Sequence, residues 1–145
     1  MKCPACANEL KTVTFGKLTV DVCQQHCGGI WFDSGELQQV DEAHEGLCDT
    51  LLRVVPNQDV AIDRNKLREC PKCEGSSLEK HFVDDDYEVQ VDECKKCHGV
   101  FLDAGELRTL REENRGEVER QEVIDSFHRR APSERVKAVF TLLFK

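Results

Sequence analysis

The sequence of 145 residues has no long apolar run and no excess of basic charge. No stretch approaches the roughly 20 apolar residues that a membrane-spanning helix needs. No apolar export signal follows Met1, so we expect a cytoplasmic protein whose thiols stay reduced. There is also no nucleophile–base constellation and no glycine-rich phosphate loop. We therefore expect no enzymatic activity.

Acidic charge dominates most of the chain. The formal net charge is −8, made up of −4 over residues 1–69, −8 over residues 70–127 and +4 over residues 128–145. Two divalent ions bound by eight thiolates would bring the whole chain to −12. Such a body repels phosphate backbones, which disfavours non-specific binding of nucleic acid and favours a basic protein surface as partner.

Cysteine is abundant, with nine residues, eight of which occur in close pairs. Modules of this size bury too little apolar surface to be secure alone, and metals or disulfides usually supply the missing stability. Where thiols stay reduced, paired cysteines favour metal over disulfide. We predict two zinc ions, each held by four cysteines: Cys3, Cys6, Cys23 and Cys27 in the first site, and Cys70, Cys73, Cys94 and Cys97 in the second.

The two predicted sites differ in spacing. In the second site, 20 residues separate two Cys-x-x-Cys pairs, whereas in the first site 16 residues separate the pairs and Cys23 is followed by three residues before Cys27. When the two copies are aligned backwards from Gly29 and Gly99, Cys27 matches Cys97 and is a ligand. Alternatively, His26 binds the ion and Cys27 is free. Zinc takes four ligands in a tetrahedron, so four protein ligands leave no position for water or substrate. Both sites are therefore predicted to be structural.

A repeated pattern surrounds each group of four cysteines. Alternating apolar residues predict a β-hairpin over residues 10–22, and a second over residues 78–91 with its turn at residues 84–86. After each site come three apolar residues that we expect in the core, Ile30-Trp31-Phe32 and Val100-Phe101-Leu102. An aspartate and a glutamate three residues later then predict a capped helix, at Asp33 and Glu36 and again at Asp103 and Glu106.

These elements predict a small, metal-stabilised α+β protein with two zinc ribbons, each made of rubredoxin-like knuckles and a β-hairpin and followed by a helix. The remaining cysteine, Cys48, is predicted to be a core residue on the first helix. A last amphipathic helix carries the basic end of the chain. The expected division is a first ribbon with its helix at 1–52, a linker at 53–69, a second ribbon with helices at 70–130 and the C-terminal helix at 131–145.

The repeated motif resembles the bacterial zinc-ribbon family named after transcription factor IIB, here in tandem. The shared pattern is Cys-Pro-x-Cys, a hairpin, Val-Asp, Cys-x-x-Cys-x-Gly and then Ile/Val-aromatic-x-Asp-x-Gly-Glu-Leu, over about residues 2–41 and 69–111. The first copy departs by one extra residue before Cys27, and the second has His98 where a glycine is usual. The resemblance implies a rubredoxin-like ribbon that binds zinc, and its name implies transcription.

Four functional hypotheses follow. The first is an adaptor whose ribbons dock a protein partner, such as part of a transcription or translation complex. The second is nucleic-acid binding, with Trp31 and Phe101 stacking on bases, although core packing is the preferred role for these rings. The third is attachment of the basic helix at 131–145 to a membrane surface. The fourth is iron-based electron transfer, since rubredoxin uses the same ligand set.

Overall fold

The computed structural model of the chain describes residues 1–41, 51–82 and 89–110. The chain divides into two compact units, Met1–Arg111 and Glu112–Lys145, and all described residues belong to the first. The predicted helix at 131–145, the aspartate turn at 84–86 and Cys48 lie outside the described residues.

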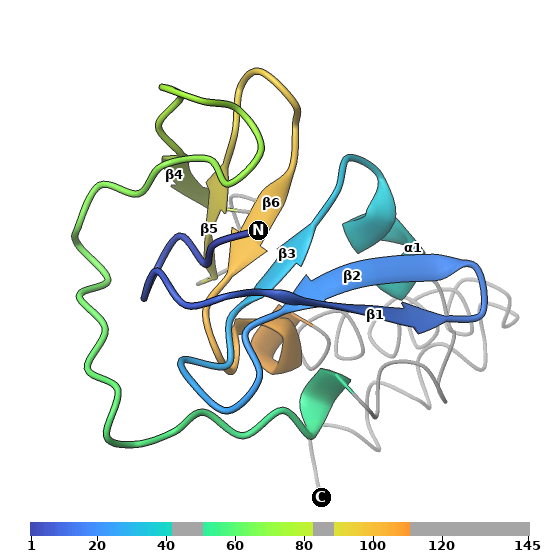
Figure 1. The fold of residues 1–145 in the computed structure, drawn as a ribbon. Helices are drawn as coiled ribbons and strands as arrows, with labels where there is room; N and C mark the ends of the chain where they lie inside the picture. The colour runs from blue at the N-terminus through green and yellow to red at the C-terminus, as the bar shows by residue number, and fades with distance from the viewer. Residues whose placement is uncertain (42–50, 83–88, 111–145) are drawn as a thin grey trace, which may run out of the picture. The chain divides into compact units, whose positions relative to one another are not determined.

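The described part of the chain is built on one six-stranded antiparallel sheet (Figure 1). Its order is β1-β2-β3-β6-β5-β4, so each copy of the motif supplies three adjacent strands. The sheet and the two cysteine groups fit the predicted zinc-ribbon fold. The strands are β1 (Lys11–Phe15), β2 (Leu18–Val22), β3 (Ile30–Phe32), β4 (Glu79–Phe82), β5 (Gln90–Glu93) and β6 (Val100–Leu102).

The two ribbons meet where β3 pairs with β6. The register places Trp31 opposite Phe101, with Ile30 opposite Leu102 on one side of this pair. Figure 1 shows β3 and β6 in the middle of the sheet, with the β1–β2 hairpin continuing on one side and the β5–β4 hairpin on the other. The arrangement of the ribbons, which the sequence pattern left open, is therefore a continuous sheet with an approximate twofold relationship between its halves.

The first hairpin follows the predicted alternation. Leu18, Val20 and Val22 are buried, whereas Thr12 on β1 is exposed and its hydroxyl donates to Asp21 Oδ1 at 2.6 Å. Phe15 pairs with Leu18 across a two-residue turn. This tight connection selects glycine at its first position, because Gly16 has a φ of 59°.

Apolar side chains form a core on each face of the sheet, since successive residues of a strand point in opposite directions. Ile30 and Phe32 belong to one core, which also contains Val40, Leu107 and Leu110 from helical segments. Trp31 and Phe101 belong to the other core together with cysteines of both sites. Both rings are fully buried, so they pack in the core as expected and are not available to stack on bases.

Helical segments begin where the capping pattern predicts them. Helix α1 spans Glu36–Asp41, and residues 106–110 are also helical. In the first ribbon the Asp33 amide donates to Glu36 Oε2 at 2.7 Å, and in the second the Asp103 amide donates to Glu106 Oε2 at the same distance. The two aspartate carboxylates instead accept hydrogen bonds from basic side chains and, at Asp33, from Trp31.

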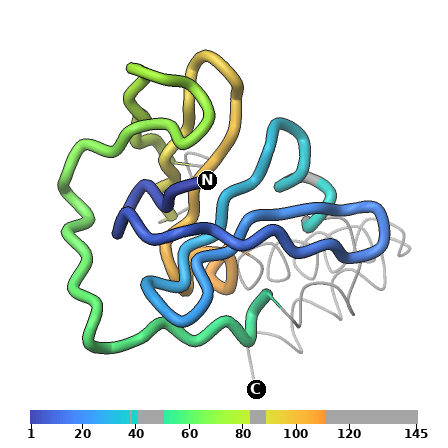
Figure 2. Tube along the Cα trace, in the orientation of Figure 1, coloured from blue at the N-terminus to red at the C-terminus, as the bar shows by residue number. Residues whose placement is uncertain are grey.

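The first part of the predicted linker, residues 53–62, lies against the first ribbon, whereas its end, at Arg68 and Glu69, pairs with the second. The Asn57 amide donates to the His26 carbonyl at 2.7 Å, and Val60 and Ile62 pack against the core that contains Cys3 and Cys27. Figure 2 traces this green segment from the first ribbon past the blue N-terminal residues to the second ribbon. We call residues 53–62 the strap, because they cover the metal-binding loop of the first ribbon.

Candidate metal centres

Each predicted group of four cysteines comes together, with all four sulfur atoms within 4.8 Å of one another. In the first site, Cys3 Sγ lies 3.4 Å from Cys27 Sγ and Cys6 Sγ lies 3.4 Å from Cys23 Sγ. In the second, Cys70 Sγ lies 3.7 Å from Cys97 Sγ. A tetrahedral zinc ion with Zn–S bonds of about 2.3 Å separates its sulfurs by about 3.8 Å, whereas a disulfide brings them to about 2.05 Å. The sulfurs therefore fit two zinc ions, and none of these eight cysteines forms a disulfide.

Local groups direct hydrogen bonds at the sulfurs. In the second site the amides of Lys72 and Cys73 donate to Cys70 Sγ at 3.4 and 3.3 Å. Ser76 Oγ lies 3.5 Å from Cys94 Sγ, and in the first site Asn8 Nδ2 donates to Cys6 Sγ at 3.5 Å. Donors of this kind stabilise thiolate charge and orient the ligands of a metal ion. In the second site, the turn from Cys70 to Cys73 thus supplies two ligands and also two amides that donate to one of them, Cys70.

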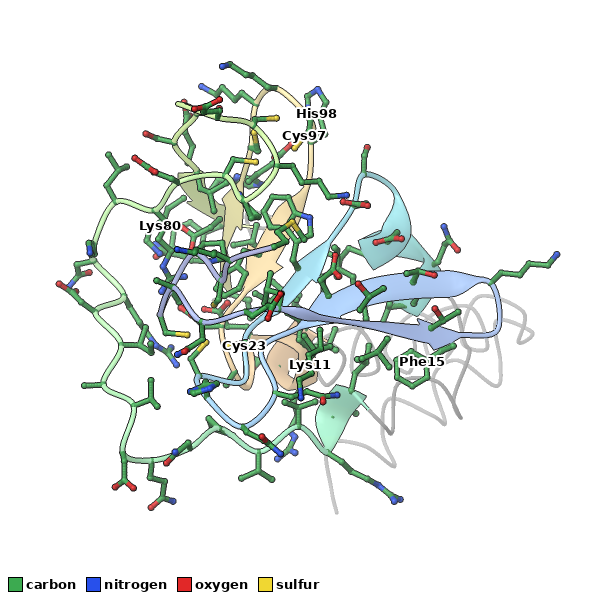
Figure 3. All side chains as sticks on the ribbon, in the orientation of Figure 1. Lys11, Phe15, Cys23, Lys80, Cys97 and His98 are labelled. Atoms are coloured by element: carbon green, nitrogen blue, oxygen red, sulfur yellow. The ribbon has the colours of Figure 1, made fainter. Side chains whose placement is uncertain are left out.

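Cys27, rather than His26, completes the first group of four sulfurs. The extra residue in this loop is absorbed where Gln25 adopts a φ of 65°. The His26 carbonyl accepts the hydrogen bond from the Asn57 amide of the strap. The loop therefore keeps the sulfur geometry of the second ribbon while presenting a backbone acceptor to the strap. Figure 3 labels Cys23 of the first site, and Cys97 of the second site next to His98.

The thiols differ widely in acidity when no cation is present. Burial raises the pKa of Cys23 to about 12, and burial likewise raises the pKa of Cys70 to about 12. Burial opposes ionisation at Cys94 too, yet the hydrogen bonds it accepts from the Cys97 and Lys96 amides and from Ser76 lower its pKa to about 6. Several protons must therefore leave before four thiolates can bind one ion.

Glycines in both metal-binding loops are pressed against an aromatic ring of the other ribbon. A Cβ added at Gly99 would lie 2.2 Å from Trp31 Cζ2, and one added at Gly29 would lie 2.3 Å from Phe101 Cζ. Only glycine allows these contacts, because real Cβ atoms do not approach so closely. Each zinc loop is thus covered by the ring that the other ribbon contributes.

A buried ionic network lies beside the second site. Arg68, only 3% exposed, donates to Asp92 Oδ2 at 2.6 Å and to Asp103 Oδ2 at 3.0 Å. Its guanidinium also lies 5.3 Å from the centroid of the Phe101 ring, and Lys80 Nζ lies 3.0 Å from Asp92 Oδ1. Sequence reasoning missed this network, because Arg68 falls in the aperiodic stretch assigned to the linker. The available signal was the aspartate that precedes the second cysteine pair in both copies, Asp21 and Asp92.

Among the described residues, His81 and His98 belong to neither group of four cysteines. His98 Nδ1 lies 3.1 Å from Glu93 Oε1, and His81 Nε2 lies 3.4 Å from Glu93 Oε2, in exposed pairs. Among the described residues, no helix is long and apolar enough to cross a membrane.

Comparison with known proteins agrees with the repeat. The family model described as transcription factor zinc-finger, of the TFIIB-type zinc ribbon, matches residues 2–43 and again residues 69–113. These two matches cover more than half of the chain and contain all eight clustered cysteines. Neither a curated protein nor a solved structure matches the chain.

Proposed function

Because this chain belongs to the TFIIB-type transcription factor zinc-finger family, in two copies, we propose that it is a non-enzymatic adaptor whose two zinc ribbons dock a protein partner. The observation that carries the proposal is the composition of both metal sites: four cysteines each. A zinc ion with four protein ligands has no open position for water or substrate, so the metal supports a fold instead of a reaction. A partner within a transcription complex would agree with the family description.

A cavity where the two ribbons meet is the docking site that best supports this proposal. It has a volume of about 300 Å³ and is lined mainly by apolar side chains, including Ile30 of the first ribbon and Leu107 of the second. Val55 of the strap also lines it and is 77% exposed. An apolar side chain of a partner would bury against this wall, and a basic surface around it would complement the acidic body.

A capture experiment with two matched variants tests the adaptor hypothesis. The zinc-loaded full chain is immobilised, and proteins that bind at stoichiometric amounts are identified and re-tested after purification. Val55→Asp should weaken the purified interaction at least about tenfold, since the bound partner would bury the introduced charge. Leu67→Asp is the control, because Leu67 is similarly exposed at 71% but does not line the cavity. Equal binding by both variants, or no stoichiometric partner, would reject this docking site.

Nucleic-acid binding is the second candidate, favoured by the family description alone. Against it stand the acidic charge of the chain and the burial of both rings that would stack on bases. Exposed lysines do occur on the second zinc loop, at Lys95 and Lys96. A titration of single- and double-stranded DNA and of RNA at low salt decides the question. Binding that weakens steeply with added salt and is lost in Lys95→Ala/Lys96→Ala would support this candidate over the adaptor.

A further inference from the structure

We propose that the two zinc sites are filled as a pair, because each metal-binding loop carries the surface on which the other ribbon's aromatic ring packs. Zinc at one site would then raise the affinity of the other, and the protein would switch between a metal-free and a two-zinc form over a narrow range of free zinc. This inference depends on zinc binding and not on the adaptor hypothesis.

The glycine under each ring is part of a zinc loop. The Gly99 carbonyl accepts a hydrogen bond from the Cys94 amide at 2.9 Å, and the Gly29 carbonyl accepts one from the Cys23 amide at 2.9 Å. Each glycine lies two residues after the last cysteine of its site. The position of the glycine is therefore tied to the loop that holds two of the four sulfurs.

The two rings connect the sites crosswise. Trp31 belongs to β3 of the first ribbon but packs on Gly99 of the second, and Phe101 belongs to β6 of the second but packs on Gly29 of the first. The two rings are directly opposite each other in the β3–β6 register. They share one buried core with Cys3, Cys23, Cys27, Cys70 and Cys94.

Loss of one ion would weaken the packing at both sites. Without metal, a loop whose cysteines are no longer tied together loses the conformation that places its glycine under the ring. The ring of the other ribbon then loses part of its burial, and with it the packing beside the other group of sulfurs. A free energy that links two binding sites acts equally in both directions, so each ion must favour the other by the same factor. Coupling of this kind typically amounts to roughly 5–150-fold in affinity.

The direct test is a zinc titration of the metal-free full chain followed by native mass spectrometry. For two independent sites of equal affinity, about half of the molecules carry one ion at half-saturation, and unequal affinities raise that share. Pairwise filling predicts a share well below half. A one-zinc form at half of the molecules or more would overturn the proposal.

Two sets of variants locate the coupling. With Cys3→Ser/Cys6→Ser, the affinity of the second site for zinc, measured by competition with a chromophoric chelator, should fall about tenfold or more. Cys70→Ser/Cys73→Ser should lower the affinity of the first site by a similar factor.

The second set keeps all eight cysteines. In Trp31→Leu/Phe101→Leu the share of the one-zinc form should rise. In the control Phe15→Leu, whose ring packs against the other core, that form should stay rare. Unchanged affinities in the first set, or an unchanged distribution in the ring variant, would contradict the proposal.

Discussion

Lys72 Nζ, in the turn between Cys70 and Cys73 of the second ribbon, donates a hydrogen bond of 2.5 Å to Asp33 Oδ2 of the first ribbon. Asp33 Oδ1 accepts another from Trp31 Nε1 at 3.0 Å. Burial alone would raise the pKa of Asp33, but the hydrogen bonds from Lys72 and Trp31 lower it below its usual value. This carboxylate therefore joins the core ring of one ribbon to the metal-binding turn of the other.

Lys72→Ala should lower the free energy of unfolding by less than about 1 kcal/mol, because both partners are partly exposed. A depressed carboxyl pKa stabilises the fold above the unfolded value of about 3.9 and that stabilisation is lost as pH falls through the folded value. The effect of Lys72→Ala should therefore be the same at pH 7 and pH 5.5. Denaturant unfolding at fixed free zinc measures it, with Lys95→Ala as control, since Lys95 pairs with Glu79 inside one ribbon.

Arg68→Met should destabilise the protein by about 3 kcal/mol or more, because it leaves buried carboxylates at Asp92 and Asp103 without their main partner. Arg64→Ala should have little effect, since Arg64 is 63% exposed and only approaches Asp103 at 4.0 Å. Denaturant unfolding of both variants with zinc bound makes the comparison. If Arg68→Met were as stable as Arg64→Ala, the buried network would not be what holds this end of the linker to the second ribbon.

Gly28→Ala should be more destabilising than Gly75→Ala. Both glycines have a positive φ, 73° and 66°, so both variants suffer similar backbone strain of about 1 kcal/mol. A Cβ at Gly28 would also lie 3.3 Å from Pro56 of the strap and 3.2 Å from the Ala104 Cβ, whereas one at Gly75 meets nothing within 4 Å. Thermal unfolding of the two variants separates strain from crowding; equal melting temperatures would show that the strap yields easily.

Zinc uptake should release protons, and the apparent zinc affinity should fall as pH is lowered. The reason is that Cys23 and Cys70, with pKa values raised to about 12 by burial, are protonated near pH 7 without metal. Calorimetry in buffers of different ionisation enthalpy counts the protons.

A strong chelator should abolish the dispersed NMR spectrum of the folded protein, whereas Cys48→Ser should still bind two zinc ions. Retention of the fold after metal removal would contradict a metal-stabilised core.

The repeat made the local structure predictable. The spacing of Cys70 to Cys97 identified a four-sulfur group, and the Asp–Glu pattern after it identified the start of a helix, because both depend on residues close in sequence. The same logic, applied by alignment from Gly29, selected Cys27 over His26. Local pattern also assigned Trp31 and Phe101 to the core.

Contacts between the copies could not be predicted in the same way. The β3–β6 pairing joins residues about 70 positions apart, and three-residue strands carry too little alternation to reveal a partner. Arg68 lies in a stretch without periodicity, so the local sequence does not predict its burial. That burial depends on ion pairs with Asp92 and Asp103, which lie 24 and 35 positions away in the sequence. The strap was assigned to a linker for the same reason. Its sequence has no periodicity, and one of its contacts with the first ribbon is made by the Asn57 amide, which any residue except proline would supply.

The β3–β6 pairing has a consequence for the integrity of the chain. Ile30, Trp31 and Phe32 are buried side chains on a strand that has a neighbour on both sides only because the second copy is present. Proteolytic cleavage that released the first copy would leave this strand as a bare apolar edge, the kind of surface that seeds aggregation. The outer strands β1 and β4, by contrast, begin or continue with charged side chains at Lys11, Glu79 and Lys80. Because both copies belong to one polypeptide, β3 and β6 pair with each other. Neither strand is then an exposed edge that could pair with a strand of a neighbouring molecule.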